Sequence, residues 1–300
     1  MSGEISKVFL VATSNRGEGT RRILEMAEEL DVKSKQVLVK PNFNTADTTP
    51  GSTHNDTLKA ILVWLKEKGA GALTLAERSG PPLTIDVLKA KGIDKLQKEL
   101  GFKLINFDEL AEEEYIHFDQ AGFHWKDGFI IPRVVTEAEV IVNTCCLKTH
   151  GFGGVFTMSL KLAVGLIPRR GFSYMSELHS SFQMGEMIAE INAAYAPDLT
   201  VMDGVEAFTA GGPATGTVKP AKVLLASSDR VALDAAGLAV LKKLGSNNVI
   251  MNTPIFAQEQ IKRAAELGLG AGAPDLIQFI TEDTKSKKYA DELKEILNKG

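Results

Sequence analysis

The sequence predicts an α/β fold in which parallel βαβ units form two lobes. In the first half, short apolar segments of strand character alternate with amphipathic helical segments. The expected strands are residues 7–13, 36–40, 72–76 and 103–106, and the expected helices are residues 18–30, 56–68 and 93–100. Strand, helix and strand at this spacing imply parallel neighbours joined by right-handed crossovers. Apolar residues at helical spacing with Gly69 just past the end mark the second helix.

The middle of the chain departs from this alternation. Residues 115–118 and 123–129 flank Gln120-Ala121-Gly122 and predict an antiparallel hairpin inserted near residues 113–130. The second half predicts strands at 140–142, 199–202 and 222–226 and helices at 157–164, 186–194, 231–244, 254–267 and 289–298. We expect an N-terminal lobe over residues 1–143 and a C-terminal lobe over residues 144–300, with the hinge near Asn143 or near Pro220, or else one continuous domain.

Composition excludes several classes of protein. The 300 residues are 44% hydrophobic and 24% charged, as in soluble globular proteins. A net charge of -4 argues against a general nucleic-acid binder. Apolar runs are too short for a membrane span and the N-terminus lacks a secretory pattern, so a cytoplasmic protein is expected. The two cysteines, Cys145 and Cys146, cannot supply four thiolates, so no iron–sulfur cluster is expected from this chain's own cysteines.

Polar side chains follow the expected strands at their carboxyl ends. They occur as Lys40-Pro41-Asn42, Glu77-Arg78-Ser79, Lys148-Thr149-His150 and Asp203-Gly204. Parallel strands bring such ends to one edge of a sheet, where ligands bind in α/β proteins. The alternative interpretation is structural, because Pro, Asn and Asp-Gly are also common in turns.

Three roles follow for these residues. Positive charge and glycine-loop amides suit a small anionic ligand, a carboxylate or a phosphate, and are supplied by Lys40, Asn42, Lys148, Gly153, Gly154 and Lys161. His54 and His150 are the proton-transfer candidates, because imidazole titrates near neutral pH, although His54 also suits a helix N-cap. Divalent-metal chemistry is a further option, with His179, Glu77 and Asp203 as ligands.

Two further positions have environments that the sequence specifies. Lys161 is the only charged residue of the apolar, helix-like segment 156–166. It is expected to pair with an anion or to have a lowered pKa, unless its stem lies along the surface. Asp229 and Asp234 are expected to be structural, with Ser228 or Asp229 as the N-cap of the helix at 231–244.

An ordered series of motifs gives the chain a family resemblance. Val39-Lys40-Pro41-Asn42, Thr53-His54, Lys148-Thr149-His150, Met202-Asp203-Gly204 and the segment from Ser228 to Ala235 resemble the domain of unknown function 362 family over about residues 7–274. Many members of that family carry a ferredoxin-like segment for iron–sulfur clusters, which this chain lacks. The biochemistry of the family is largely unassigned.

A second resemblance suggests a reaction. His150, the glycines after it, Lys161, Gly165, Pro168 and His179 occur in an order similar to that of the nickel-pincer lactate racemases. This resemblance implies that Lys161 holds a nickel-containing cofactor, His179 binds metal, and His54 and His150 form an acid/base pair.

The sequence thus supports two classes of function. The first is an enzyme that acts on a small anionic substrate at the strand ends, metal- or cofactor-dependent and racemase-like. The alternative is a non-catalytic carrier for an anion or cofactor, which needs the lysines but not the histidines. A scaffold subunit with purely structural motifs fits the density of strand-end lysines least well.

Overall fold

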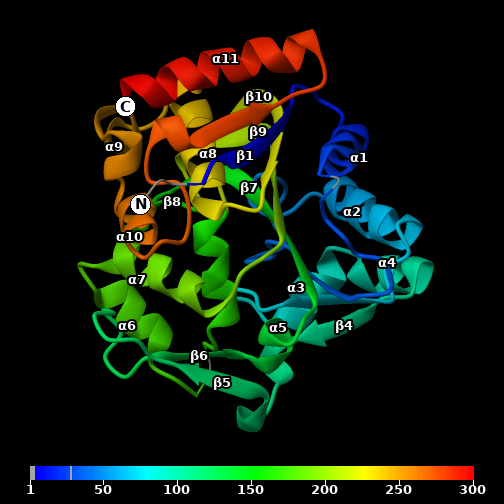
Figure 1. Cartoon of the computed structure of the whole chain (residues 1–300). Coiled ribbons are helices and arrows are strands. Elements are labelled where there is room, and N and C mark those ends of the chain that lie inside the picture. The colour runs from blue at the N-terminus through cyan, green and yellow to red at the C-terminus, as the bar shows by residue number, and fades with distance from the viewer. Residues whose placement is uncertain (1–3, 28, 170) are drawn as a thin grey trace.

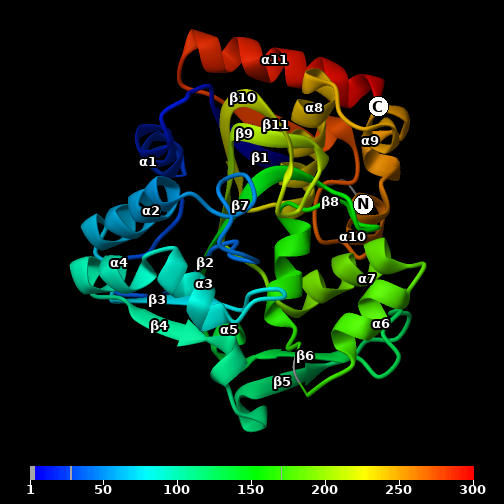
Figure 2. The ribbon, with the colours of Figure 1, turned by 180° about the vertical axis from the view of Figure 1, so that it is seen from behind.

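The computed structural model describes residues 4–27, 29–169 and 171–300 and has a layered α/β architecture (Figures 1 and 2). A large sheet crosses the molecule with helices on both of its faces, and the strand order is β11-β1-β10-β9-β7-β2-β3-β4. Along this order every pair of neighbours is parallel except the two pairs that β10 makes. The predicted α/β class with parallel βαβ units is therefore confirmed.

The strands of the main sheet are β1 (Ser6–Val11), β2 (Gln36–Lys40), β3 (Ala72–Glu77), β4 (Lys103–Asn106), β7 (Val140–His150), β8 (Val155–Phe156), β9 (Leu199–Gly211), β10 (Gly216–Ser227) and β11 (Ile277–Ile280). A separate antiparallel pair is formed by β5 (Tyr115–Phe118) and β6 (Phe129–Pro132). The α-helices are α1 (Arg16–Met26), α2 (Asn55–Glu67), α3 (Thr84–Ala90), α4 (Ile93–Leu100), α5 (Arg133–Thr136), α6 (Tyr174–Ser180), α7 (Met184–Ile191), α8 (Arg230–Leu244), α9 (Asn248–Asn252), α10 (Glu259–Glu266) and α11 (Thr284–Lys299). The 3-10 helices are η1 (Phe107–Glu109), η2 (Glu112–Glu114), η3 (Leu160–Leu166), η4 (Asn192–Ala194), η5 (Ile255–Ala257) and η6 (Pro274–Leu276).

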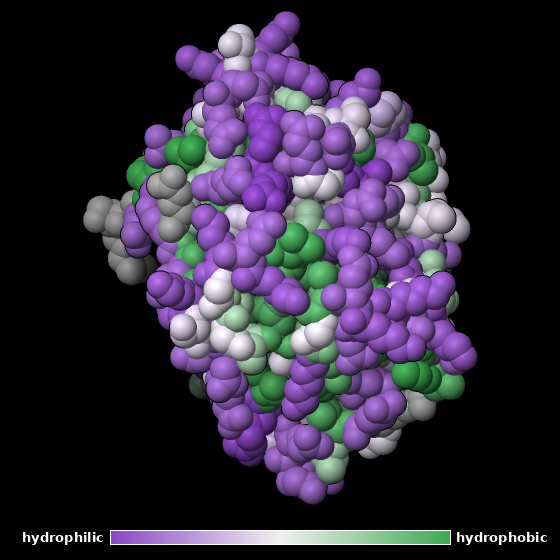
Figure 3. Space-filling model, turned by 90° about the vertical axis from the view of Figure 1, so that its right-hand side faces the viewer, coloured by the Kyte–Doolittle hydropathy of each residue, from purple (hydrophilic) through white to green (hydrophobic). Residues whose placement is uncertain are grey.

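Alternation along the strands builds a core on each face of the sheet. In β2, Val37 and Val39 belong to the cluster that packs against α1 to α4, while Leu38 belongs to the cluster with η3, α6 and α7. Successive strand side chains point to opposite faces, so a wholly apolar strand is one that is covered on both sides. A third cluster packs α8, α10 and α11 against β1, β7, β9 and β10. Figure 3 shows the outer face over α1, α2 and α4, most of which is hydrophilic.

Several predicted boundaries are wrong, and their errors share one cause. β7 runs on through Lys148 to His150 instead of ending near Val142, and β9 runs on through Asp203 to Gly211. Polar residues can continue a strand where neighbouring strands pair with it. The parallel pairing of β7 with β9 extends to Lys148 and Phe208, and the last residues of β7 pair with β8. β9 then turns directly into β10, which pairs with it in antiparallel fashion. The inserted hairpin is confirmed, although its second strand is Phe129–Pro132 rather than residues 123–129.

Further elements differ from expectation. The segment predicted as a helix at 157–164 instead contains the start of the 3-10 helix η3 (Leu160–Leu166), and the elements α3, α5, α6, α9, β8 and β11 were not predicted. Strand β7 passes without interruption through Asn143, the predicted lobe boundary. None of the described helices is long and apolar enough to cross a membrane.

Candidate active site

A cavity of about 520 Å³ lies beyond the carboxyl ends of β2, β3 and β7. Seven of the predicted site residues line it: Lys40, Asn42, Glu77, Lys148, His150, Lys161 and His179. The parallel register explains why three strands contribute, because Lys40 of β2 pairs with Asn143 of β7 and Val39 with Leu75 of β3. The expected convergence of strand ends is thus present for these three strands.

Lys40 and Glu77 form a buried ion pair in the wall of this cavity. Lys40 Nζ lies 2.7 Å from Glu77 Oε1, and each residue is about 1% exposed. Glu77 Oε2 also accepts the Phe43 N–H at 2.8 Å and Oε1 accepts the Arg78 N–H at 2.8 Å, so the carboxylate is fully engaged. Burial lowers the pKa of Lys40, and Glu77 opposes that change. The pair contributes little net charge to a ligand.

The backbone of η3 closes tightly over this ion pair at Gly165. A Cβ added to Gly165 would lie 2.7 Å from Lys40 Nζ and 3.3 Å from Glu77 Oε1. Only a residue without a side chain lets η3 approach this closely. Gly165 therefore brings the helix that carries Lys161 onto the strand ends.

Lys148 is held by three oxygen acceptors from three separate segments, none of which carries a charge. Its Nζ donates to Gly51 O at 2.6 Å, Asn42 Oδ1 at 3.0 Å and Pro213 O at 3.2 Å. Pro213 reaches this position because the β9–β10 turn packs on β7, where a Cβ at Gly212 would lie 2.1 Å from Thr149 O. Burial lowers the pKa of Lys148, and no ion pair to a carboxylate is present among the described residues.

Lys161 lies at the start of η3, and Asp234 of α8 fixes this helix in place. The Asp234 carboxylate accepts the N–H groups of Ser159 at 2.7 Å and Leu160 at 2.9 Å, directly before Lys161. Lys161 itself makes no hydrogen bond or ion pair with any other residue that the structure describes. Burial, together with the charges of Lys148 and Arg78, lowers the pKa of Lys161 to about 8.

The environment of His150 fixes its protonation state and its tautomer. Burial lowers the pKa of His150 to about 3, and the positive charges of Lys161 and Lys148 act in the same direction. The ring is therefore neutral near pH 7. Its Nδ1 accepts the Phe152 N–H at 3.2 Å, so the single ring proton lies on Nε2. His150 is thus a hydrogen-bond donor at Nε2 rather than a ready base.

His179 of α6 has the opposite arrangement. Its Nδ1 lies 2.6 Å from the Met175 carbonyl oxygen, to which only a protonated nitrogen can donate. In the neutral ring this leaves the lone pair on Nε2. The cavity therefore contains one histidine that can donate from Nε2 and one that can accept there.

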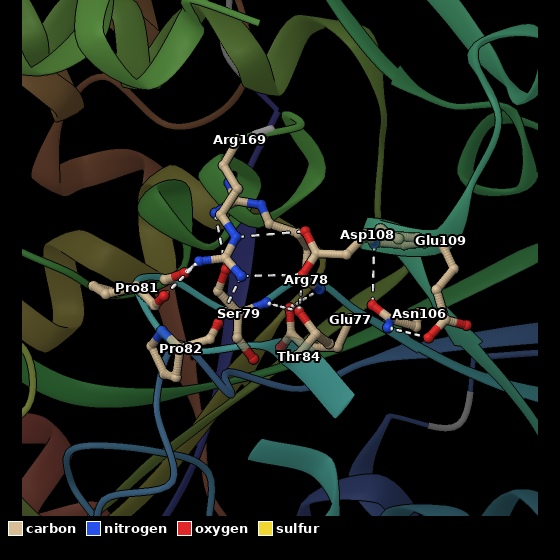
Figure 4. A network of polar contacts seen from close by, with 12 residues as sticks. Glu77, Arg78, Ser79, Pro81, Pro82, Thr84, Asn106, Asp108, Glu109 and Arg169 are labelled. Atoms are coloured by element: carbon tan, nitrogen blue, oxygen red, sulfur yellow. Dashed lines mark hydrogen bonds and ion pairs between the residues drawn. The ribbon is translucent and has the colours of Figure 1, made fainter. Parts of the chain in front are cut away.

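Two arginines of the described residues, Arg78 and Arg169, also line the cavity, and Figure 4 shows how they are held. Arg169 forms an ion pair with Asp108 at 3.2 Å and donates to the carbonyls of Pro81 and Pro82. Arg78 donates to the carbonyls of Ser79 and Val164, and burial lowers its pKa to about 10. The sequence placed Arg78 in a strand-end cluster without a role and missed Arg169, for which the basic pair after Pro168 was the available signal.

Two predicted site residues lie elsewhere. His54 is the N-cap of α2, where its Nδ1 accepts the Asp56 N–H at 3.1 Å, and it does not line the cavity. Burial, followed by the charge of Arg16, lowers its pKa. Asp203 is fully buried in the middle of β9 and is bound to Arg16 at 2.9 Å and to Thr57 Oγ1 at 2.9 Å. The predicted His54–His150 pair is therefore not brought together.

The glycine loop has a more indirect role than predicted. Gly153 and Gly154 line a second, smaller cavity of about 140 Å³. A Cβ at Gly154 would lie 3.3 Å from His150 Nδ1 and 3.5 Å from Lys161 Cε. This glycine therefore packs against both side chains. These two glycines shape the site without lining the main cavity.

The predicted metal-ligand set does not assemble. Within the described ranges, no group of three or more His, Cys, Asp or Glu side chains is placed to hold a metal ion. Glu77 is engaged by Lys40, Asp203 by Arg16, and only Glu77 and His179 share the cavity. The donor set does not fit a metal held by His179, Glu77 and Asp203.

Known proteins resemble this chain in sequence and in structure. The thylakoid-associated protein sll1697 of Synechocystis is 34% identical over 204 residues, which cover 66% of this chain and 60% of the relative. The chain therefore spans about 60% of the length of that relative. Among solved structures, a protein from Thermotoga maritima aligns with a TM-score of 0.48 and 14% identity, covering 83% of this chain and 59% of that one. The lactate racemase apoprotein of Thermoanaerobacterium thermosaccharolyticum aligns with a TM-score of 0.44 and 13% identity, covering 98% of this chain and 86% of that one.

The family model described as domain of unknown function (DUF362) matches residues 37–239. This match includes β2, β7 and η3, which carry the lysines of the cavity, β3, which carries Glu77, and the part of α8 that carries Asp234. By this match, which covers more than half of its length, the chain belongs to the domain of unknown function 362 family.

Proposed function

We propose that the protein is an enzyme that acts on a small anionic substrate, a carboxylate or a phosphate, bound in this cavity. The observation that carries the proposal is that two lysines of the cavity, Lys148 and Lys161, have no carboxylate partner among the described residues. Lys148 is bonded to uncharged oxygens and Lys161 has no partner among the described residues, while the carboxylate that lines the cavity, Glu77, is engaged by Lys40. A buried ammonium without a counter-charge is costly, and a bound anion removes that cost.

The same residues favour an enzyme that transfers a proton over a protein that only binds the anion. With a pKa of about 8, Lys161 is an ammonium in most molecules near pH 7, yet a useful fraction is the free amine, as suits a general base. His150 presents an Nε2–H that can donate to charge developing on the substrate, as neutral donors in such sites do. For a carboxylate, the reaction class is removal of a proton from the neighbouring carbon.

A racemase-like reaction needs a second proton-transfer group. His54 lies outside the cavity, whereas His179 lines it with its Nε2 lone pair available. We therefore assign the second proton-transfer role to His179 in place of His54. The two groups line the same cavity from different helices, Lys161 from η3 and His179 from α6.

Exchange of carbon-bound protons with solvent tests the reaction without knowledge of the product. The protein is incubated in D₂O with a panel of 2-hydroxy, 2-amino and simple carboxylic acids, and loss of the proton signal next to the carboxylate is followed by NMR. We expect exchange with at least one member of the panel, abolished by Lys161→Met. The matched control is Lys59→Met, which removes an exposed lysine of α2 paired with Glu99 outside the cavity.

The rival function is that of an anion carrier, and one observation favours it. The ring proton of His150 is held on Nε2, so this histidine can contribute to binding without taking part in proton transfer. Calorimetric binding of an anion that depends on Lys161, without any solvent exchange, would decide for the carrier. Absence of both binding and exchange would contradict the proposed function in either form.

A further inference from the structure

We propose that the natural ligand is an organic dianion, with its two negative charges at one end and an apolar body. This inference rests on the proposed function and narrows its substrate class. The dianionic end is a phosphate monoester or a pair of carboxylates that contacts Lys161 directly and lies near the positive charge of Lys148, whose three N–H groups are donated to Asn42, Gly51 and Pro213. The apolar body lies against the apolar side chains that line the same cavity.

The charges of the side chains that line the cavity indicate how many negative charges the ligand carries. Among the described residues, five cationic side chains line it, Lys40, Arg78, Lys148, Lys161 and Arg169, against one carboxylate, Glu77. Lys40 is neutralised by Glu77 and Arg169 by Asp108. The side chains of Arg78 and Lys148 donate only to uncharged acceptors and Lys161 has no partner among the described residues, so these three cations have no ion-paired carboxylate. A phosphate monoester, which carries about -1.5 to -2 charges at pH 7, offsets most of this positive charge, whereas a monoanion does not.

The apolar part of the wall gives the second property of the ligand. The apolar side chains that line the cavity are Pro81, Phe152, Leu162, Val164, Met175 and Pro213. Leu162 and Val164 lie on η3, directly after Lys161, so one helix presents the charged contact and the apolar contacts together. An inorganic anion or a three-carbon acid would reach the lysines but would leave this wall in contact with water.

The size of the cavity supports the same conclusion. Its volume of about 520 Å³ lies within the range of sites that enclose drug-sized ligands. Phe152 is 70% exposed at the edge of the cavity, and a ligand with an apolar body would cover part of this ring. The ligand is therefore substantially larger than its charged group.

Isothermal titration calorimetry with four probe compounds separates the contribution of the ligand's charge to affinity from that of its apolar body. Phenyl phosphate carries both properties, methyl phosphate keeps the two charges without the body, and benzenesulfonate keeps the body with one charge. Phenylsuccinate replaces the phosphate by two carboxylates. At pH 7 we expect phenyl phosphate or phenylsuccinate to bind at least tenfold more tightly than either methyl phosphate or benzenesulfonate, and the preferred one of the two identifies the charged group.

Two variants assign each effect to its part of the cavity. Lys161→Met should weaken phenyl phosphate at least tenfold and benzenesulfonate by a smaller factor, because a dianion loses more attraction than a monoanion when one ammonium is removed. Met175→Ala should weaken phenyl phosphate and leave methyl phosphate unchanged. Equal affinities for phenyl and methyl phosphate would contradict the inference that the ligand has an apolar body. Equal affinities for phenyl phosphate and benzenesulfonate would contradict the inference that it carries two negative charges. In both cases the proposed anion site stands, whereas no binding by any of the four compounds removes that site as well.

Discussion

Lys40 Nζ lies 2.7 Å from Glu77 Oε1, and this ion pair joins the carboxyl ends of two neighbouring parallel strands, β2 and β3. Both side chains are buried and line the cavity. Removing one partner of such a pair leaves an uncompensated charge, which is far more costly than the pair is stabilising. The pair therefore fixes the geometry of the site, and the lysines that it leaves unpaired, Lys148 and Lys161, provide the charge for a ligand.

Gly165→Ala should disturb this ion pair directly. The added methyl group would lie 2.7 Å from Lys40 Nζ, so η3 or the lysine must shift. We expect the free energy of unfolding to fall by about 1–3 kcal/mol, as for other overpacked sites. Urea denaturation measures the change, and Gly17→Ala in α1 is the matched control, because the nearest neighbour of its Cβ lies at 3.8 Å. Equal stability of the two variants would show that η3 does not pack on the pair as described.

Asp229→Ala should destabilise the protein without a direct effect on the cavity. Asp229 caps α8 by accepting the N–H groups of Val231 and Ala232, and its other oxygen accepts the N–H of Ala271 at 2.7 Å. Loss of the cap costs about 1 kcal/mol and the unpaired Ala271 N–H adds about 1–3 kcal/mol. Asp229→Asn, which keeps an oxygen for the helix, should cost less. Loss of anion binding at unchanged stability would contradict this structural role.

Asp234→Asn should affect both stability and the site. The amide cannot accept both the Ser159 and the Leu160 N–H, so we expect a cost of about 1–3 kcal/mol and a shift of η3 that weakens anion binding through Lys161. Burial raises the pKa of Asp234 to about 7, above the value of about 3.9 in an unfolded chain. The folded state therefore binds this proton more tightly, and the stability of the wild type relative to Asp234→Asn should decline as pH rises from about 4 to 7. A stability difference that is constant with pH would contradict this assignment.

The sequence predicted the part of the site that depends on local pattern. Lys40 and Glu77 follow buried apolar strands, and parallel pairing of β2, β3 and β7 brings their carboxyl ends together with Lys148. Lys161 was also identified from the sequence, because it is the only charged residue of an apolar segment, and it lines the cavity. These features follow from strand register and burial, which composition and periodicity encode.

The rest depended on long-range pairing that the sequence does not show. Asp203 was expected at a strand end, but β9 continues past it because β7 and β10 pair with it on both sides. His54 is the N-cap of α2, and the neighbouring sequence does not show that this residue lies outside the cavity. Arg169 reaches the cavity through contacts with Asp108 and the carbonyls of residues 81 and 82, which are distant in sequence.

Anion binding should depend on pH through Lys161. Its pKa of about 8 implies that the ammonium form dominates below pH 7, so affinity should be level there. As pH rises through 8, affinity for a fully ionised ligand should fall by up to tenfold per unit, because an anion binds the charged form. Lys148, Arg78, His150 and His179 also face this space, so Lys161→Met provides the reference. Calorimetric titrations from pH 6.5 to 9.5 with the two proteins would give the difference, and parallel pH profiles would exclude Lys161 as the titrating group.

A crystal structure with bound tungstate tests the central claim most directly, because tungsten scatters anomalously and its position needs no assumption about the natural ligand. We expect an anomalous peak inside the cavity, with a tungstate oxygen about 2.7–3.2 Å from the Nζ atom of Lys161. The same soak of Lys161→Met crystals should lose or weaken this peak. Tungstate bound only at surface sites, with none in the cavity of the wild-type protein, would contradict the account.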